Sequence, residues 1–271
     1  MSNLRIQQRM DALKASGRKA LIPYIVAGDP TPSITVPAMH AMVAAGADVI
    51  ELGMPFSDPF ADGPVNQRGA ERAIAAGMTL PGVINAVAEF RKQDDQTPVV
   101  LMGYLNPLIA MGETTFCEAC ENAGVDGLLI VDMPPEEEGS LVQSAKRHGL
   151  DLIYLAAPTT TDARLETIGN ATSGYLYYVS LKGITGSSKL DTHEVSQRIA
   201  HMRQHVSVPI CVGFGIRTAE DAAAISTTAD GSIVGTVLVS QVEALANQPE
   251  QIPAALQAIL QPMRQAMDAK A

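Results

Sequence analysis

Residues 45–64 read Ala-Gly-Ala-Asp-Val-Ile-Glu-Leu-Gly-Met-Pro-Phe-Ser-Asp-Pro-Phe-Ala-Asp-Gly-Pro. This stretch leaves a helical pattern through Gly46, runs through an apolar strand over residues 48–52 and breaks into a loop rich in Pro and Gly. It carries two carboxylates, Glu51 at the end of the strand and Asp62 in the loop. An unpaired charge in an apolar strand is costly, so Glu51 is either paired or placed at a site that uses a perturbed acid.

The same change from helix to apolar strand recurs along the whole chain. Short apolar, β-branched runs alternate with longer segments of helical periodicity, such as residues 32–45 and 80–92. This alternation predicts parallel pairing, and strands that are apolar on both faces predict a sheet buried on both sides. The eight runs are residues 20–27, 48–52, 98–102, 127–131, 152–156, 175–180, 209–213 and 231–235.

The joints between helices and strands look alike. Gly46, Gly124 and Gly149 each stand near the end of a helical pattern, where a left-handed residue is favoured. Eight such units predict an α/β fold, the (β/α)₈ or TIM barrel. We expect an extra N-terminal helix over residues 3–16 that plugs the barrel, a short helix after strand 8 and a closing helix over residues 250–270. No segment resembles a linker, so we expect residues 1–271 to form a single catalytic domain.

Bulk properties exclude several classes of function. The chain has 271 residues, 46% of them hydrophobic, and a net charge of −10, which disfavours nucleic acid and anionic membrane surfaces as partners. There is no apolar signal core, and no run approaches the roughly 20 apolar residues of a membrane span. We therefore expect a soluble, cytoplasmic protein. Cys117 and Cys120 form a C-x-x-C sequence inside a helical pattern, which favours a structural role over a redox one.

In barrels of this kind the active site lies at the C-terminal ends of the strands, where both carboxylates are expected. An inward acid among Val, Ile and Leu predicts a general acid of raised pKa at Glu51. The alternative is a structural acid paired with Lys182 or Arg68. Asp62 alone could be turn chemistry, because Asp-Gly is a common turn dipeptide. Together, the two suggest one protonated and one ionised group.

Three segments that contain glycine follow the last three strands. They are residues 182–186, residues 213–216 and the pair Gly235-Thr236. Barrels often bind phosphate with the loops after strands 7 and 8 and a short extra helix, so this rim predicts a phosphate site. Apolar and aromatic groups at the strand ends predict either barrel core or a pocket for an aromatic phosphate ester; they are Tyr24, Met102, Tyr104, Leu129, Tyr177 and Phe214.

The histidines do not predict a metal site. His201 and His205 have helical spacing, but no glutamate lies between them and we expect no third ligand nearby.

Taken in order, the motifs resemble those of one known family, the α subunit of tryptophan synthase. The run over residues 51–64 is highly specific, whereas the phosphate glycines are shared with many barrels. The matches cover nearly the whole chain and are residues 23–30 (PYIVAGDP), 51–64 (ELGMPFSDPFADGP), 104–107 (YLNP), 132–134 (DMP), 177–186 (YYVSLKGITG) and 212–216 (VGFGI).

The resemblance implies a lyase of tryptophan biosynthesis that cleaves indole-3-glycerol phosphate into indole and glyceraldehyde 3-phosphate without a metal or an organic cofactor. It implies that Glu51 protonates indole C3 and takes the proton of the glycerol hydroxyl. It also implies that ionised Asp62 hydrogen-bonds the indole N–H and that Tyr177 positions the reacting group. The implied phosphate residues are Gly186, Gly213, Gly215, Gly235 and Thr236. The implied indole pocket is lined by Tyr24, Met102, Leu129 and Phe214.

The family also closes two segments over its site and works with a second subunit. The resemblance implies that residues 56–64 and 183–189 act as lids, with Thr185 closing towards Asp62. It further implies that indole passes to a pyridoxal-phosphate β subunit in an αββα complex. The rim around Pro55, Asp58 and the segment 106–107 is expected to form that interface.

Other functions remain open from the residues alone. A pentose-phosphate epimerase predicts a metal or paired aspartates on different strands, and an indole-glycerol-phosphate-forming synthase predicts catalytic lysines at strand ends; neither set is evident. A pseudo-enzyme that binds the phosphate ligand only to activate a partner is disfavoured by the presence of both Glu51 and Asp62. A stand-alone lyase that releases free indole is a third alternative.

Overall fold

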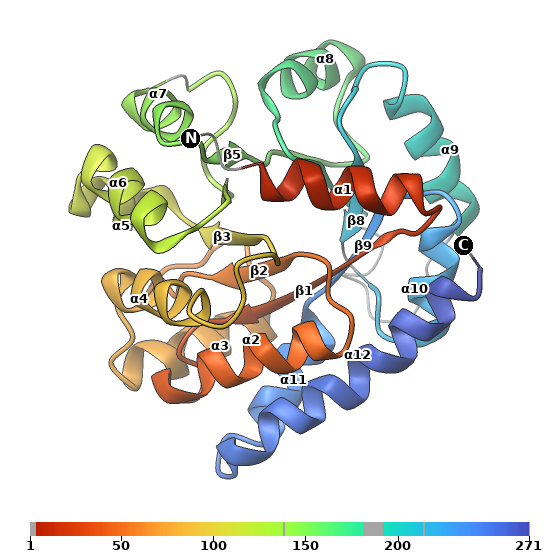
Figure 1. Cartoon of the computed structure of the whole chain (residues 1–271). Coiled ribbons are helices and arrows are strands. Elements are labelled where there is room, and N and C mark those ends of the chain that lie inside the picture. The colour runs from red at the N-terminus through yellow and green to blue at the C-terminus, as the bar shows by residue number, and fades with distance from the viewer. Residues whose placement is uncertain (1–3, 138, 181–191, 214, 271) are drawn as a thin grey trace.

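The computed structural model describes residues 4–137, 139–180, 192–213 and 215–270, and its strands form one curled sheet with helices outside it (Figure 1). All neighbouring strands are parallel, in the order β5-β4-β3-β2-β1-β9-β8-β7-β6. The strands are β1 (Ala20–Val26), β2 (Ile50–Gly53), β3 (Val99–Gly103), β4 (Gly127–Ile130), β5 (Asp151–Leu152), β6 (Leu155–Ala156), β7 (Leu176–Val179), β8 (Ile210–Gly213) and β9 (Gly231–Val234).

The strands at the two ends of this order, β5 and β6, are halves of one run that closes the barrel. β5 pairs with β4, and β6 pairs with β7. Between the halves, Ile153 N donates to Leu128 O at 2.9 Å, and Tyr177 N donates to Tyr154 O at 3.0 Å. The predicted (β/α)₈ barrel is therefore confirmed. The other predicted runs each match one strand, with ends that differ by at most two residues, whereas the run predicted as a single fifth strand is interrupted where its pairing changes from β4 to β7.

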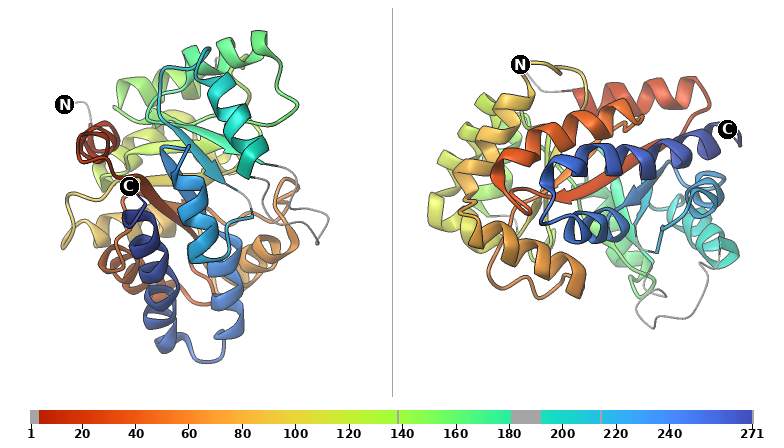
Figure 2. Two further views of the ribbon diagram at one scale, coloured as in Figure 1. Left: turned by 90° about the vertical axis from the view of Figure 1, so that its right-hand side faces the viewer. Right: turned by 90° about the horizontal axis from the view of Figure 1, so that it is seen from below.

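Helices surround the strands, as the periodicity predicts. The predicted N-terminal helix, the short helix after the last strand (α11) and the closing helix (α12) are confirmed, and α12 packs against α2 and α10 (Figure 2). The helices are α1 (Arg5–Ala15), η1 (Pro32–Ile34), α2 (Thr35–Ala44), α3 (Pro64–Ala75), α4 (Leu80–Phe90), α5 (Leu105–Met111), α6 (Glu113–Ala123), α7 (Ser140–Arg147), α8 (Asp162–Ala171), α9 (Thr192–Met202), α10 (Ala219–Ser226), α11 (Thr236–Ala244), η3 (Pro249–Gln251) and α12 (Ile252–Asp268).

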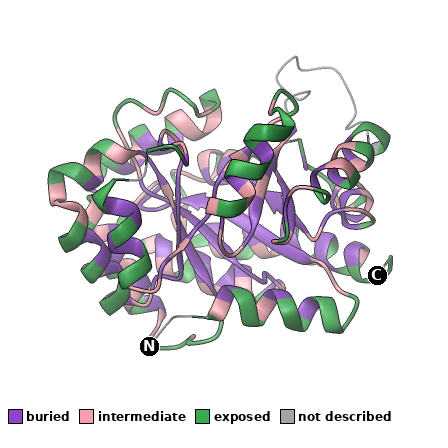
Figure 3. Ribbon diagram, turned by 90° about the horizontal axis from the view of Figure 1, so that it is seen from above, coloured by how far each residue is buried: buried purple, intermediate pink, exposed green. Residues whose placement is uncertain are grey.

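The apolar core has two layers (Figure 3). One lies between the sheet and the outer helices. The other fills the barrel interior, where Ile6, Met10 and Leu13 of α1 pack against inward residues of the strands, including Tyr175. Helix α1 covers the end of the barrel at which the strands begin. The opposite end, where the strands finish, is therefore left for the site.

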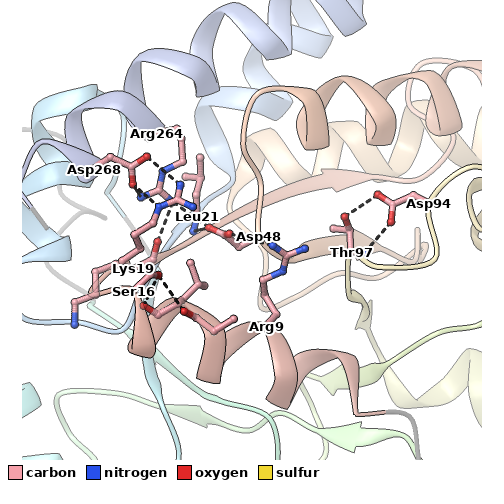
Figure 4. A network of polar contacts seen from close by, with 12 residues as sticks. Arg9, Ser16, Lys19, Leu21, Asp48, Asp94, Thr97, Arg264 and Asp268 are labelled. Carbon is pink, nitrogen blue, oxygen red and sulfur yellow. Dashed lines mark hydrogen bonds and ion pairs between the residues drawn. The ribbon is translucent and has the colours of Figure 1, made fainter.

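Buried ion pairs fasten α1 and α12 to the N-terminal ends of the strands (Figure 4). Asp48 accepts the Leu21 N–H at 2.9 Å and forms an ion pair with Arg264 at 3.0 Å. Arg9 of α1 lies 3.9 Å from the same carboxylate. These groups satisfy Asp48 in a buried place, where an unpaired charge would be strongly destabilising.

The local features predicted at helix ends are also found. Gly46, Gly124 and Gly149 have φ angles of 99°, 80° and 66°, the left-handed region that favours glycine. Cys117 and Cys120 are buried free thiols in α6. Within the described residues, no single helix passes a length and hydropathy test for a membrane span; α3 and α4 pass it only as a pair bent by 92°.

Candidate active site

Glu51 lies near the C-terminal end of β2 and is fully buried inside the barrel. Its Oε1 accepts a hydrogen bond from Tyr175 Oη at 2.6 Å, while Oε2 has no partner within the described part of the chain. Burial raises the pKa of Glu51 to about 7, against a smaller opposing effect of the Tyr175 hydrogen bond. The carboxyl group can therefore gain and lose a proton near neutral pH, as a general acid and base must.

Arg68, one of the two structural partners considered for Glu51 from sequence, does not pair with it. Arg68 is bonded to Glu243, with Nε 2.6 Å from Oε1, so this alternative is wrong. Lys182 lies outside the described residues. Among the described residues, Glu51 is surrounded by one tyrosine hydroxyl and the apolar barrel interior, a setting that keeps a carboxyl group protonated at higher pH.

Asp62 lies in the loop between β2 and α3. Its Oδ2 accepts a hydrogen bond from Tyr104 Oη at 2.7 Å, and its Oδ1 accepts one from Asn66 Nδ2 at 3.4 Å. Burial raises the pKa of Asp62, and these two hydrogen bonds act in the opposite direction. The two carboxylates thus differ in setting: Glu51 has one hydrogen-bond donor, and Asp62 has two.

Tyr104 fastens the loop that carries Asp62. Besides donating to Asp62, its hydroxyl accepts the Ala61 N–H at 3.1 Å. The rings of Phe56 and Phe60 lie 5.4 Å and 5.5 Å from the Tyr104 ring, both tilted. One residue at the end of β3 therefore positions the second carboxylate through two hydrogen bonds and two aromatic contacts.

Replacing Tyr104 by Phe tests this positioning. The ring contacts persist, but Asp62 loses a hydrogen bond of the charged type, worth about 1.5–3 kcal/mol. We expect the rate of the reaction proposed below to fall by about 10-fold or more. The pKa of Asp62 should rise further, so the loss should grow as pH falls. Steady-state kinetics across pH measure both effects. Tyr178→Phe, on the helix-facing side of β7, is the control, and equal rates in the two variants would contradict the role.

Both carboxylates act on the same two tyrosines, which shows that they share one site. Burial, followed by the charges of Asp62 and Glu51, raises the pKa of Tyr24 well above its usual value. The pKa of Tyr177 is raised by burial and by the same two carboxylates. Both hydroxyls therefore remain protonated and can donate. Glu51, Asp62 and Tyr177, which were predicted separately, are brought together here.

The predicted phosphate residues lie on two adjacent strand ends. Gly213 ends β8, and Gly215 follows with φ of 80°, as a turn requires. Gly235 and Thr236 connect β9, the neighbour of β8, to the start of α11. The first N–H groups of a helix have no intrahelical partner, so this corner can bind an anion. Gly186 lies outside the described residues.

Two of the residues predicted to line an indole pocket lie at one hollow. Tyr24 and Met102 line a narrow hollow beside Asp62, together with Met54, Phe56 and Tyr104. Leu129 is fully buried in the barrel interior and does not line this hollow. Thr185 and Phe214 lie outside the described residues. Free space in the hollow is about 10 Å³, roughly one water molecule, so a ring the size of indole needs the segment 54–62 to move.

Sequence reasoning missed Tyr175 as a partner of Glu51. It begins the run from which Tyr177 was chosen, and residues two apart in a strand point to the same side. That alternation could have placed both tyrosines inside the barrel. The pairing of Tyr175 with Glu51, 124 positions away, has no local signal.

The expectation for the histidines is wrong in one respect. His201 Nε2 lies 2.7 Å from Asp162 Oδ1, so a third potential ligand is present beside His201 and His205. This cluster lies at the ends of α8 and α9, on other elements than those that carry Glu51 and Asp62.

A parallel (β/α)₈ barrel that holds a glutamate of raised pKa and a second carboxylate at the C-terminal rim defines an acid–base enzyme of the barrel class. The model of one family, described as "Tryptophan synthase alpha chain", matches residues 10–268. A tryptophan synthase alpha chain from Nitrosococcus oceani is 56% identical over 265 residues, with 98% of each chain covered. One from Laribacter hongkongensis is 55% identical, covering 98% of this chain and 99% of the relative.

Solved structures agree with these relatives. Tryptophan synthase subunit alpha from Legionella pneumophila superposes with a TM-score of 0.92 at 44% identity, covering 99% of both chains. A chain of the M. tuberculosis tryptophan synthase, in an aminoacrylate-bound form, gives a TM-score of 0.85 at 31% identity, covering 98% of this chain and 100% of that one. The chain belongs to the tryptophan synthase alpha chain family and is an enzyme subunit.

Proposed function

We propose that this chain is a carbon–carbon lyase that cleaves indole-3-glycerol phosphate into indole and glyceraldehyde 3-phosphate, with residues 1–271 acting as one catalytic domain. The observation that carries the proposal is the buried Glu51, whose pKa of about 7 suits a group that must both give and take a proton. The family to which the chain belongs supports the same reaction.

In this reaction, Glu51 protonates indole C3, and the ring nitrogen supplies the electron pair. The bond between C3 and the glycerol carbon then breaks, its electrons return to the ring, and the adjacent hydroxyl becomes the aldehyde as its proton passes to Glu51. The free Oε2 of Glu51 is the atom available to the substrate, since Oε1 is already bonded to Tyr175. One carboxyl group can serve both steps because its pKa lies near neutrality.

Asp62 stabilises the cation that forms in between. As a carboxylate it accepts the indole N–H and offsets the positive charge on the protonated ring. Tyr104 holds the carboxylate in place, and Tyr177 positions the reacting group from the opposite strand end. Because the hollow beside Asp62 is too narrow for the substrate, the segment 54–62 opens to admit it and closes for the reaction.

The phosphate end of the substrate binds across the neighbouring strand ends. Main-chain N–H groups around Gly213, Gly215 and Gly235 and the hydroxyl of Thr236 are the donors, together with the positive end of α11. No lysine or arginine occurs in the segments 213–216 and 235–236. We therefore expect recognition by backbone geometry, which fixes the phosphate without adding a mobile charge.

The indole product passes to a pyridoxal-phosphate β subunit in an αββα complex. The rim predicted as the interface exposes apolar surface: Phe60 is 68% exposed and Ile109 is 54% exposed. Both residues are connected to Tyr104. The ring of Phe60 contacts the Tyr104 ring, and Ile109 lies on α5, which begins at the residue directly after Tyr104. A partner on this rim would therefore press on the segment that positions Asp62.

One assay tests the proposal. The purified chain is given indole-3-glycerol phosphate, and indole release is measured with and without a tryptophan synthase β subunit. We expect slow turnover alone and strong stimulation by the partner. Turnover that is fast alone and unchanged by the β subunit would favour a stand-alone lyase. Binding without turnover in either condition would favour the pseudo-enzyme.

A further inference from the structure

We propose that the ends of α8 and α9 form a binding site for a divalent transition metal, with Zn²⁺ as the best-fitting ion. The ligands are His201 and His205 from one side and Asp162 from the other, with Glu166 beside His205. The site is separate from the proposed chemistry at Glu51. A bound ion would link α8 to the end of α9 on the outside of the barrel.

Distances within the cluster carry the proposal. His201 Nε2 is 2.7 Å from Asp162 Oδ1, and His205 Nδ1 is 3.3 Å from Glu166 Oε1. The two imidazole rings lie 5.2 Å apart, between centroids. One ligand atom from each of Asp162, His201 and His205 can be chosen so that all three lie within 4.8 Å of one another. Ligands around a tetrahedral zinc ion lie about 2.0–2.2 Å from it, so small side-chain rotations bring these atoms onto one ion.

The sequence places these groups in register. Asp162 and Glu166 are four residues apart on α8, so they lie one turn apart on the same face. His201 is in the last turn of α9, and His205 follows in the turn after it. The two histidines therefore lie on one side of the cluster and Asp162 on the other, with Glu166 one helical turn from Asp162.

The chemistry of the four groups selects the metal. Two imidazoles with one or two carboxylates suit Zn²⁺, whereas Ca²⁺ and Mg²⁺ prefer oxygen ligands alone. The carboxylates are open to solvent, with 59% of the Asp162 side chain and 64% of the Glu166 side chain exposed, so an ion can enter. Arg198 acts on the Asp162 carboxylate and is the nearby cation that the metal competes with.

The test uses the full chain, stripped with a chelator and titrated with ZnCl₂ by calorimetry. We expect one site in the wild type and a rise in its melting temperature with Zn²⁺. The double variant His201→Ala/His205→Ala should bind Zn²⁺ at least about 10-fold more weakly, and Zn²⁺ should no longer raise its melting temperature. Removing a group that hydrogen-bonds a metal ligand already weakens metal binding about 10-fold, and removing the ligand itself should cost at least as much. Co²⁺ should show the visible bands of a tetrahedral site in the wild type only.

His148→Ala is the matched control, because His148 Nδ1 is 2.7 Å from Glu121 Oε2 in the same kind of pair but, within the described residues, belongs to no group of three potential ligands. It should bind Zn²⁺ like the wild type. Asp162→Asn keeps a hydrogen-bond acceptor for His201 and should still weaken Zn²⁺ binding. This variant therefore distinguishes a metal ligand from a residue that only links α8 to the end of α9 by a hydrogen bond. If the wild type does not bind Zn²⁺, or if the double variant binds it equally well, the proposal is overturned.

Discussion

Replacing Glu51 by Gln is expected to reduce the cleavage of indole-3-glycerol phosphate by about 1,000-fold or more, since acid–base groups contribute about 100- to 10,000-fold and this one serves two steps. The amide can still accept the Tyr175 hydrogen bond and has nearly the same volume, so the barrel interior stays packed. Phosphate-ligand binding should persist, because the phosphate residues lie on β8 and β9. Indole release measures the rate, and calorimetry with the phosphorylated product measures binding.

The same substitution should stabilise the fold at higher pH. The pKa of Glu51 is raised from 4.5 to about 7, so the unfolded chain ionises first as pH rises, and the native state loses stability between pH 4.5 and about 7. At 1.36 kcal/mol per pKa unit, this loss is about 3 kcal/mol above pH 7. Glu51→Gln should escape it, so the free energies of unfolding of the two proteins should diverge with rising pH.

Denaturant unfolding between pH 4.5 and 8 measures this difference. Glu118→Gln, an exposed glutamate on α6, is the control and should follow the wild type in both rate and stability. A Glu51→Gln variant with a near-wild-type rate would show that the acid–base assignment is wrong. A wild-type stability that does not fall relative to the variant would show that the carboxyl group is not perturbed by burial.

The fold was largely predictable because its signals are local. Each strand is a short apolar run bounded by turn residues, and the left-handed glycines Gly46, Gly124 and Gly149 each stand beside a helix end. The one predicted strand that is divided in the structure, over residues 152–156, changes pairing partner in its middle. That change depends on which strands flank it in space, which no window of sequence contains.

The site was predictable only where chemistry and topology coincide. Glu51 could be found because a carboxyl group at the end of an apolar strand is costly unless it is used. Its bond to Tyr175 and the bond between Tyr104 and Asp62 join positions 124 and 42 residues apart, so they follow from the closed barrel and not from spacing. The same holds for Asp162 beside His201, 39 residues away. Family resemblance supplied the roles that geometry alone leaves open.

Replacing Gly213 by Ala is expected to lower kcat by on the order of 100-fold, because a displacement of about 1 Å in a catalytic site has that cost. A Cβ at this position would lie 2.1 Å from Tyr177 Oη and 2.3 Å from its Cζ, far closer than atoms can pack. Either the Tyr177 ring or the end of β8 must move, and Tyr177 lies beside both carboxylates. Overpacking of this kind costs about 1–3 kcal/mol, so the protein should still fold.

Kinetics distinguish the two roles that Gly213 could have. If the added methyl group displaces Tyr177, kcat falls and KM changes little. If it only weakens phosphate binding at the rim, KM rises while kcat is kept. Gly139→Ala is the control, since a Cβ there would meet its nearest neighbour, Glu137 O, at 3.9 Å. A Gly213→Ala enzyme with wild-type kcat would contradict the placement of Tyr177 at the reacting centre. The steric conflict predicts a lower kcat, because the ring that fills the space above Gly213 carries the hydroxyl whose pKa the charges of Glu51 and Asp62 raise.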